Sequence, residues 1–185
     1  RRLLEEHPES PLAPKGAFRA GYLLEHRLKN LDAAVKTYLR ASTSFPEFEG
    51  EPALNPGAHS GWRAGWRALN LAGVLRNDPR TRRGLADYGL QETICNQLVD
   101  AYPDHRAQLY VHMMHSAMLE YGRGRIPNDR NGKKTQVSKA LDWARKAIDA
   151  EPGANAPLRL LALHAEEGRQ DYLIRYLKSD ELNRS

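Results

Sequence analysis

The sequence predicts an all-α fold, arranged as an α-solenoid of about four helical hairpins with a terminal helix. Three observations predict it. A six-residue motif recurs, helix ends marked by proline stand at repeated distances from small residues, and no segment alternates strictly between apolar and polar residues as a strand would. We expect residues 1–185 to form one repeat array, and Arg1–His7, which reads as the tail of a helix, suggests a piece of a longer chain.

The recurring motif reads small, aromatic, Arg, Ala, Gly, aromatic, at Ala17–Tyr22 and again at Gly61–Trp66. Residues four apart share a helix face, so the first and fifth positions of each copy form a notch. Glycine inside a helix costs about 0.5–1 kcal/mol relative to alanine. We therefore expect Gly21 and Gly65 to admit a neighbouring helix at close range.

Prolines mark the ends of four helices, because proline cannot continue a helix and disfavours helical geometry at the preceding residue. In three cases a small residue follows the proline after 13 positions, and after Pro46 the distance to Gly65 is 19. The three regular pairs are Pro8 with Gly21, Pro103 with Ser116, and Pro152 with Ala165. This spacing fixes a loop and a first helix in each hairpin.

The second helices carry narrow apolar stripes at the helical period. Ala34, Tyr38 and Ala41 precede Pro46 with the same spacing by which Ala140, Ala144 and Ala147 precede Pro152. The helix before Pro103 has the same helical spacing, at Ile94, Leu98 and Ala101, but it lacks the alanine-rich pattern of the other two. The expected helices are residues 1–7, 14–28, 30–44, 58–75, 83–102, 105–121, 135–150, 155–167 and 169–178.

Two segments, 76–83 and 122–134, are rich in Gly, Asn, Pro and positive charge, so we expect loops there. Each follows the first helix of a hairpin, and such loops in stacked hairpins emerge along one edge. The basic edge expected from them consists of Arg76, Arg80, Arg82, Arg83, Arg123, Arg125, Arg130, Lys133 and Lys134. It would suit nucleic acid or an anionic lipid surface. Neither loop holds an aromatic residue, which argues against sequence-specific reading of RNA.

The composition is that of a folded soluble protein, with 41% hydrophobic and 28% charged residues. No run approaches the roughly 18 apolar residues that a membrane span needs. A single cysteine, Cys95, excludes an internal disulfide and a zinc site built of several thiolates, and its place in a helical pattern predicts a buried apolar residue. The net charge of +5 favours an acidic partner.

The two alanine stripes resemble the second-helix signature of tetratricopeptide repeats, with Ala144 in place of the usual aromatic residue. Pro8–Ala17, with Gly21 following, resembles more specifically a bacterial cell-envelope subgroup, which includes outer-membrane assembly lipoproteins and the periplasmic cell-division coordinator. The resemblance implies a non-enzymatic protein-interaction scaffold in a larger envelope or membrane complex. It favours the periplasm or envelope as the location, with the cytoplasm as the alternative.

In that family the first helices line a concave groove. Carried over to this sequence, the groove would be lined by Phe18, Tyr22, Glu25, Trp62, Trp66, Leu69, Tyr110, Met113 and Glu120. An aromatic groove suits an apolar peptide or an amphipathic helix of a partner protein. The alternative is that these aromatic residues pack between hairpins and meet no ligand.

No arrangement of residues predicts catalysis, a metal or a cofactor. His112 and His115 have the spacing of helical metal ligands but lack an adjacent Glu and a third ligand, so packing or surface histidines are expected. Ser116 lies near both histidines, but it is already explained as the small residue that follows Pro103 after 13 positions. Arg63 and Arg67 are like charges four residues apart, which fits a solvated face. The alternative is an acidic group, in this chain or in a partner, that relieves their repulsion.

Overall fold

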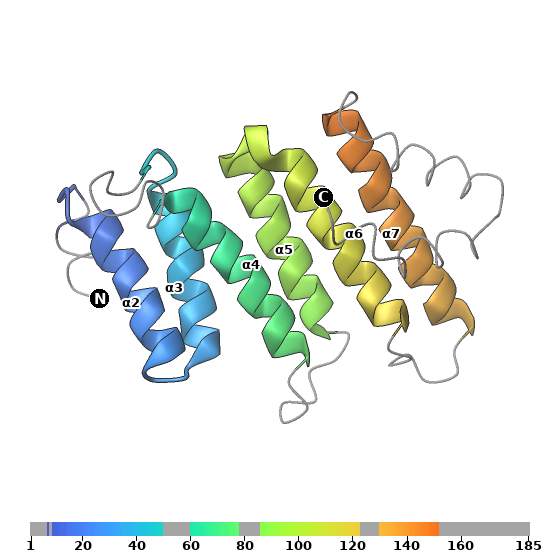
Figure 1. Ribbon diagram of the computed structural model, residues 1–185, viewed down its shortest axis with the longest axis horizontal. Coiled ribbons are helices and arrows are strands. Elements are labelled where there is room, and N and C mark those ends of the chain that lie inside the picture. Colours follow the sequence, from blue (N-terminus) through green and yellow to red (C-terminus); the bar gives the residue numbers. More distant parts are fainter. Residues whose placement is uncertain (1–6, 8, 50–59, 78–85, 123–129, 152–185) are drawn as a thin grey trace, which may run out of the picture. The chain divides into compact units, whose positions relative to one another are not determined.

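The computed structural model describes residues 7, 9–49, 60–77, 86–122 and 130–151 (Figure 1). These ranges hold the α-helices α2 (Ala13–His26), α3 (Leu31–Ser44), α4 (Gly61–Asn77), α5 (Ala86–Ala101), α6 (Arg106–Gly122) and α7 (Arg130–Ala150), and a short 3₁₀-helix at Pro103–His105. They contain no strand. The prediction of an all-α fold is confirmed for this part of the chain.

The helix boundaries follow the sequence prediction most closely in the first hairpin and least closely at α7. The expected helix 135–150 begins at Arg130 instead, and Arg76 and Asn77 belong to α4 rather than to a loop. The expected loop 122–134 is therefore too long, and the expected loop 76–83 begins two residues too early. Arginine, lysine and glutamine are good helix formers, and their propensity outweighs the single Gly132. The helices expected at 155–167 and 169–178, and the one at 1–7 apart from His7, lie outside the described residues.

The chain divides into two compact units, residues 1–103 and 104–185, and each is described by itself. In the first unit, α2 to α5 follow one another as antiparallel neighbours (Figure 1). Each packs against the next along the chain, and α3 also contacts α5. Small residues bring these helices close together, since Ala13, Ala17, Ala34 and Ala68 are completely or almost completely buried.

Larger side chains fill the core between the alanines. Tyr38, Leu69, Ile94 and Leu98 are almost inaccessible to solvent. Cys95 is also buried, as the sequence predicted. The first unit is thus a row of antiparallel helices with an ordinary apolar interior.

The two glycine notches are confirmed as places of close helix approach. A Cβ atom added at Gly21 would lie 2.7 Å from Cδ1 of Tyr38 on α3. One added at Gly65 would collide with Leu98 of α5 and with Ser42 of α3. Each notch therefore receives a side chain from α3 or α5, and a larger residue would fit there only if that side chain moved.

Side chains cap two of the helices in the first unit. Asn30 accepts a hydrogen bond from the backbone N–H of Ala33 at 3.1 Å, which caps α3 after a turn through Lys29 at a φ of 53°. The Ser60 hydroxyl accepts one from the backbone N–H of Arg63 at 3.2 Å and caps α4. This cap fixes the start of α4, whose first two turns carry Trp62, Trp66 and Arg67 of the candidate site.

In the second unit, α6 and α7 pack against each other. Leu109, Met113 and Met114 of α6 are fully buried, and Ala144 and Trp143 of α7 are buried as well. None of the helices in the described ranges combines the length and apolar character needed to cross a membrane.

Candidate functional site

A buried carboxylate joins three helices of the first unit. The Glu25 residue of α2 is only 5% exposed. Its Oε2 accepts hydrogen bonds from the Tyr38 hydroxyl of α3 at 3.1 Å and from Nε of Arg67 on α4 at 2.9 Å. Nη2 of Arg67 donates to the other oxygen, Oε1, so the guanidinium holds the carboxylate with two bonds. This network fixes α2 and α4 on either side of α3.

The network keeps Glu25 ionised. Burial raises the pKa of Glu25, but the hydrogen bonds and charge of Arg67, with contributions from Tyr38 and His26, outweigh burial and hold the pKa below its ordinary value. Burial, together with the charge and hydrogen bond of Glu25, raises the pKa of Tyr38 well above its ordinary value. Tyr38 therefore stays a hydroxyl donor, and the pair of Glu25 and Arg67 stays charged near neutral pH.

The acidic group that was one of the alternatives for Arg63 and Arg67 is thus Glu25, which pairs with Arg67 and lies 42 residues earlier in the chain. Arg63, the other cation of that pair, is exposed. Glu25 was also expected to line the groove. The structure places it beneath the surface, where Tyr38 and Arg67 already occupy both carboxylate oxygens.

Three aromatic side chains of α2 and α4 are partly exposed. Tyr22, almost one turn before Glu25, is 50% exposed, and its ring centroid lies 4.3 Å from that of His26. Trp62 and Trp66 of α4 are half-buried, with ring centroids 5.5 Å apart. Trp62 also meets the ring of Tyr102 edge to face at 5.4 Å. We call Tyr22, Trp62 and Trp66 the aromatic face.

The remaining groove candidates lie deeper or elsewhere. Phe18 is half-buried and contacts the Tyr38 ring edge to face at 5.3 Å. Leu69 and Met113 are fully buried and belong to the cores of their units. Tyr110 lies in the second unit, where its ring centroid is 5.7 Å from that of Trp143. Glu120 is part of α6, and its side chain is outside the described residues. A groove running through both units stays a prediction.

The basic edge falls mostly outside the described residues, which exclude Arg80, Arg82, Arg83, Arg123 and Arg125. Arg76 belongs to the end of α4, and Arg130, Lys133 and Lys134 belong to the start of α7. These positions lie in different units. That the two segments are neighbours therefore stays a prediction.

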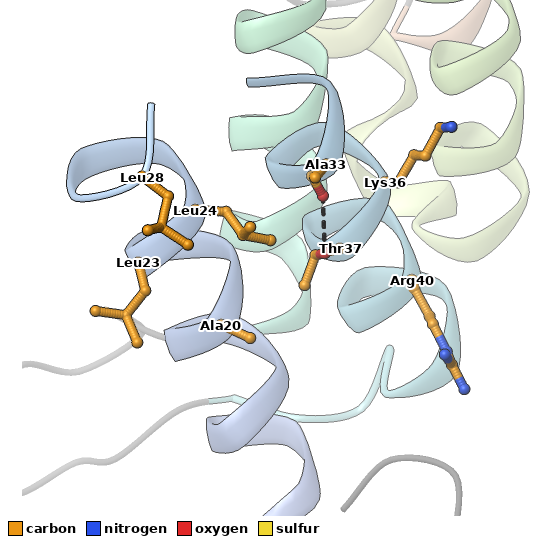
Figure 2. A pocket seen from close by; sticks show the side chains of 8 residues that line it. All are labelled: Ala20, Leu23, Leu24, Leu28, Ala33, Lys36, Thr37 and Arg40. Carbon is orange, nitrogen blue, oxygen red and sulfur yellow. Dashed lines mark hydrogen bonds between the residues drawn. The ribbon is translucent and has the colours of Figure 1, made fainter. Parts of the chain in front are cut away.

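A hollow of about 610 Å³ between α2 and α3 was not foreseen from the sequence. Figure 2 shows Leu23, Leu24 and Leu28 on its α2 side, with Lys36 and Arg40 on the α3 side. Leu23 is 51% and Leu28 is 69% exposed. The sequence signal was the cluster of three leucines at the end of the first repeat motif. Periodicity alone did not show which side of the hairpin they would face.

The histidines of α6 form no recognisable metal centre. Among the described residues, no group of three or more His, Cys, Asp or Glu side chains is placed to hold a metal ion. Nε2 of His115 is buried and finds no hydrogen-bond partner in the part of the chain that the structure describes. Burial lowers the pKa of His115, so it is held in the neutral form.

Comparisons with known proteins add no assignment to this geometry. No protein-family model matches the chain, and neither the curated proteins nor the solved structures include one that matches it significantly.

Proposed function

We propose that the chain is a non-enzymatic protein-interaction scaffold with tetratricopeptide-like hairpins, and that its aromatic face binds an apolar peptide or an amphipathic helix of a partner. The observation that carries this proposal is the partial exposure of Tyr22, Trp62 and Trp66 on the two first helices α2 and α4. Large aromatic side chains at a surface are the usual anchors of protein interfaces.

The network below the aromatic face supports this function. Glu25, Tyr38 and Arg67 link α2, α3 and α4, so the helices that carry the aromatic residues are held by contacts that a ligand does not have to supply. A binding surface on rigid helices loses less conformational entropy on association than one on loops. A preformed aromatic face of this kind suits a scaffold.

The helix pairings of the first unit support the stacked arrangement. Helix α4 packs against both α3 and α5, and the second helices α3 and α5 also touch. Contacts between successive second helices are expected when each hairpin stacks on the one before. The likeness of Pro8–Ala17 to cell-envelope repeats favours a periplasmic or membrane-associated complex as the setting.

The proposal is tested with helical peptides selected from a display library on the intact chain. Binding of these peptides is then measured for Tyr22→Ala and for Trp66→Ala, with Leu90→Ala on α5, which is 36% exposed, as the control. Loss of at least about tenfold in affinity for the aromatic variants alone supports the proposal. Circular dichroism establishes that helix content is unchanged. Equal binding by all three variants would refute it.

A second candidate function is binding of a polyanion through basic residues at the start of α7. Arg130, Lys133 and Lys134 lie in its first turns, and that first turn contains no acidic residue. Cations at a helix N-terminus are disfavoured by the helix dipole, and a bound anion would relieve them.

A further inference from the structure

The hollow between α2 and α3 is bordered by apolar side chains that the fold leaves in solvent. Leu23 and Leu28 are more than half exposed, and Leu24 and Ala20 lie deeper beside them. Isolated exposed leucines are common on protein surfaces. Leucines gathered around one hollow of about 610 Å³ are typical of an interaction site instead.

The shape of the hollow matches a helix. Its lining recurs every three or four residues on both walls, at Ala20 and Leu23–Leu24 on α2, and at Ala33, Lys36–Thr37 and Arg40 on α3 (Figure 2). On α3 this stripe spans two turns, which is about 10 Å of helix. Two packed helices present such stripes as a groove, and the side-chain ridge of a third helix fits into it.

The hairpin of α2 and α3 that forms the hollow carries a net positive charge. Residues 13–44 contain six lysines and arginines against two acidic residues, and one of these, Glu25, is buried against Arg67. Lys36 and Arg40 are exposed on the α3 rim, and Figure 2 shows their charged ends turned away from the leucines. A helix seated in the hollow would therefore meet apolar side chains at its centre and cations along the α3 edge.

We infer that the hollow between α2 and α3 docks an amphipathic helix of a partner protein, with leucine-like residues on its inner face and acidic residues along the edge that meets Lys36 and Arg40. This is a second interaction surface, separate from the aromatic face, and it does not depend on the function proposed for that face. A second copy of the chain fits the hollow less well, because a symmetric contact would set two basic rims against each other.

The test uses two synthetic peptides of about 18 residues, since shorter helices are marginal in water. Both carry leucines at helical spacing, and they differ only in having glutamates or lysines along the flanks. Fluorescence anisotropy with the full chain is expected to show saturable binding of the glutamate peptide and at least about tenfold weaker binding of the lysine peptide.

Variants then locate the binding site. Leu23→Glu with Leu28→Glu should weaken binding of the glutamate peptide at least about tenfold. Leu12→Glu should not, because Leu12 is 62% exposed but does not line the hollow. Lys36→Glu with Arg40→Glu should reverse the preference in favour of the lysine peptide. Arg19→Glu with Arg63→Glu, which replaces two exposed cations outside the lining, is the matched charge control.

Four results would overturn the inference. The first three are binding of neither peptide, equal binding of both, and binding that Leu23→Glu with Leu28→Glu leaves unchanged. A dimer in sedimentation equilibrium that Leu28→Glu dissociates would assign the hollow to a second copy and would also overturn it. Urea unfolding of each variant ensures that any lost binding reflects the surface and not the fold.

Discussion

The Tyr102 hydroxyl, just beyond the end of α5, donates a hydrogen bond to the backbone carbonyl of Ser42 at 2.9 Å and accepts one from the Ser42 hydroxyl at 3.0 Å. Ser42 lies in the last turn of α3, where helix carbonyls lack partners within the helix. Both residues are buried, and burial raises the pKa of Tyr102. One phenol thus completes the end of α3 from a position 60 residues later in the chain.

We expect Tyr102→Phe to lower the free energy of unfolding by about 1–3 kcal/mol, because it leaves the buried hydroxyl and carbonyl of Ser42 without this partner. Urea denaturation followed by circular dichroism measures the change. Tyr22→Phe is the control, since Tyr22 is half exposed and should change the stability by less than about 0.5 kcal/mol. Equal effects of the two substitutions would contradict the role assigned to Tyr102.

Removal of the cation beside Glu25 should also destabilise the chain. We expect Arg67→Ala to cost about 1–3 kcal/mol of unfolding free energy, because it leaves a buried carboxylate without its main partner. The expected loss of unfolding free energy is smaller than for a fully buried ion pair, because the Arg67 side chain is 45% exposed and solvent screens its interaction with Glu25. Arg63→Ala, one turn earlier on α4 and exposed, should change stability by less than about 0.5 kcal/mol in the same urea titration.

The same pair predicts a pH dependence with a definite sign. Because the pKa of Glu25 is lowered on folding, its contribution is present above the ordinary value of 4.5 and is lost as the pH falls through the lower, folded-state pKa. The stability difference between the wild-type chain and Glu25→Gln should therefore shrink as the pH is lowered below about 4.5. A difference that stays constant as the pH falls well below 4.5 would contradict the pairing.

The helices were largely predictable because their signals are local. Proline marks the ends of the helices, and alanine recurs on their packed faces. Each glycine notch predicts one neighbouring helix at close range. An acidic group near Arg67 followed from Arg63 one turn away only as the alternative to a solvated face. The identity of that group did not, because Glu25 is 42 residues distant and stands at a position that looks like a groove-facing surface.

The hollow and the start of α7 are two further features that the sequence did not predict. Leu23, Leu24 and Leu28 fall in the expected helix 14–28, and only the packing of α2 on α3 reveals that these leucines border a hollow. At α7, Gly132 and the basic residues suggested a loop, but the run continues as helix from Arg130. For the hollow, the outcome depends on which surface the packed helices leave uncovered, and sequence periodicity does not contain that information. For α7, the helix propensity of arginine, lysine and glutamine outweighs the single glycine.

If the basic residues at the start of α7 bind a polyanion, the affinity should fall steeply between about 50 and 200 mM salt. Lys133→Glu with Lys134→Glu should weaken binding of single-stranded DNA and of anionic vesicles alike, because simple charge attraction does not distinguish the two. Lys36→Glu with Arg40→Glu, in the other unit, is the control of equal charge. An affinity that is independent of salt would exclude this second candidate function.

His115 should make the stability of the chain depend on pH near neutrality. Burial lowers the pKa of this imidazole from its ordinary value of 6.5, so the unfolded chain takes up a proton more readily than the folded one. The wild-type chain should therefore lose stability as the pH falls below about 6.5, and His115→Gln should lose less over the same range. Unfolding free energies measured between pH 5 and 7.5 test this. The exposed His7→Gln is the control and should follow the wild type.

Two glycine-to-alanine substitutions should change the stability in opposite directions. Alanine is favoured over glycine inside a helix by up to about 1 kcal/mol, so the sign depends on the space around the added methyl group. At Gly21 that group would lie 2.7 Å from the Tyr38 ring, which is itself held by Glu25. We expect a net loss of about 1–3 kcal/mol there from overpacking.

At Gly89 on α5 nothing lies within 4 Å of the added group. Gly89→Ala should therefore raise the free energy of unfolding by about 0.5–1 kcal/mol. Urea denaturation of both variants beside the wild type measures the two changes. Stabilisation by Gly21→Ala would mean that α2 and α3 do not approach each other as closely as the notch requires, and the stacking of the first hairpin would have to be reconsidered.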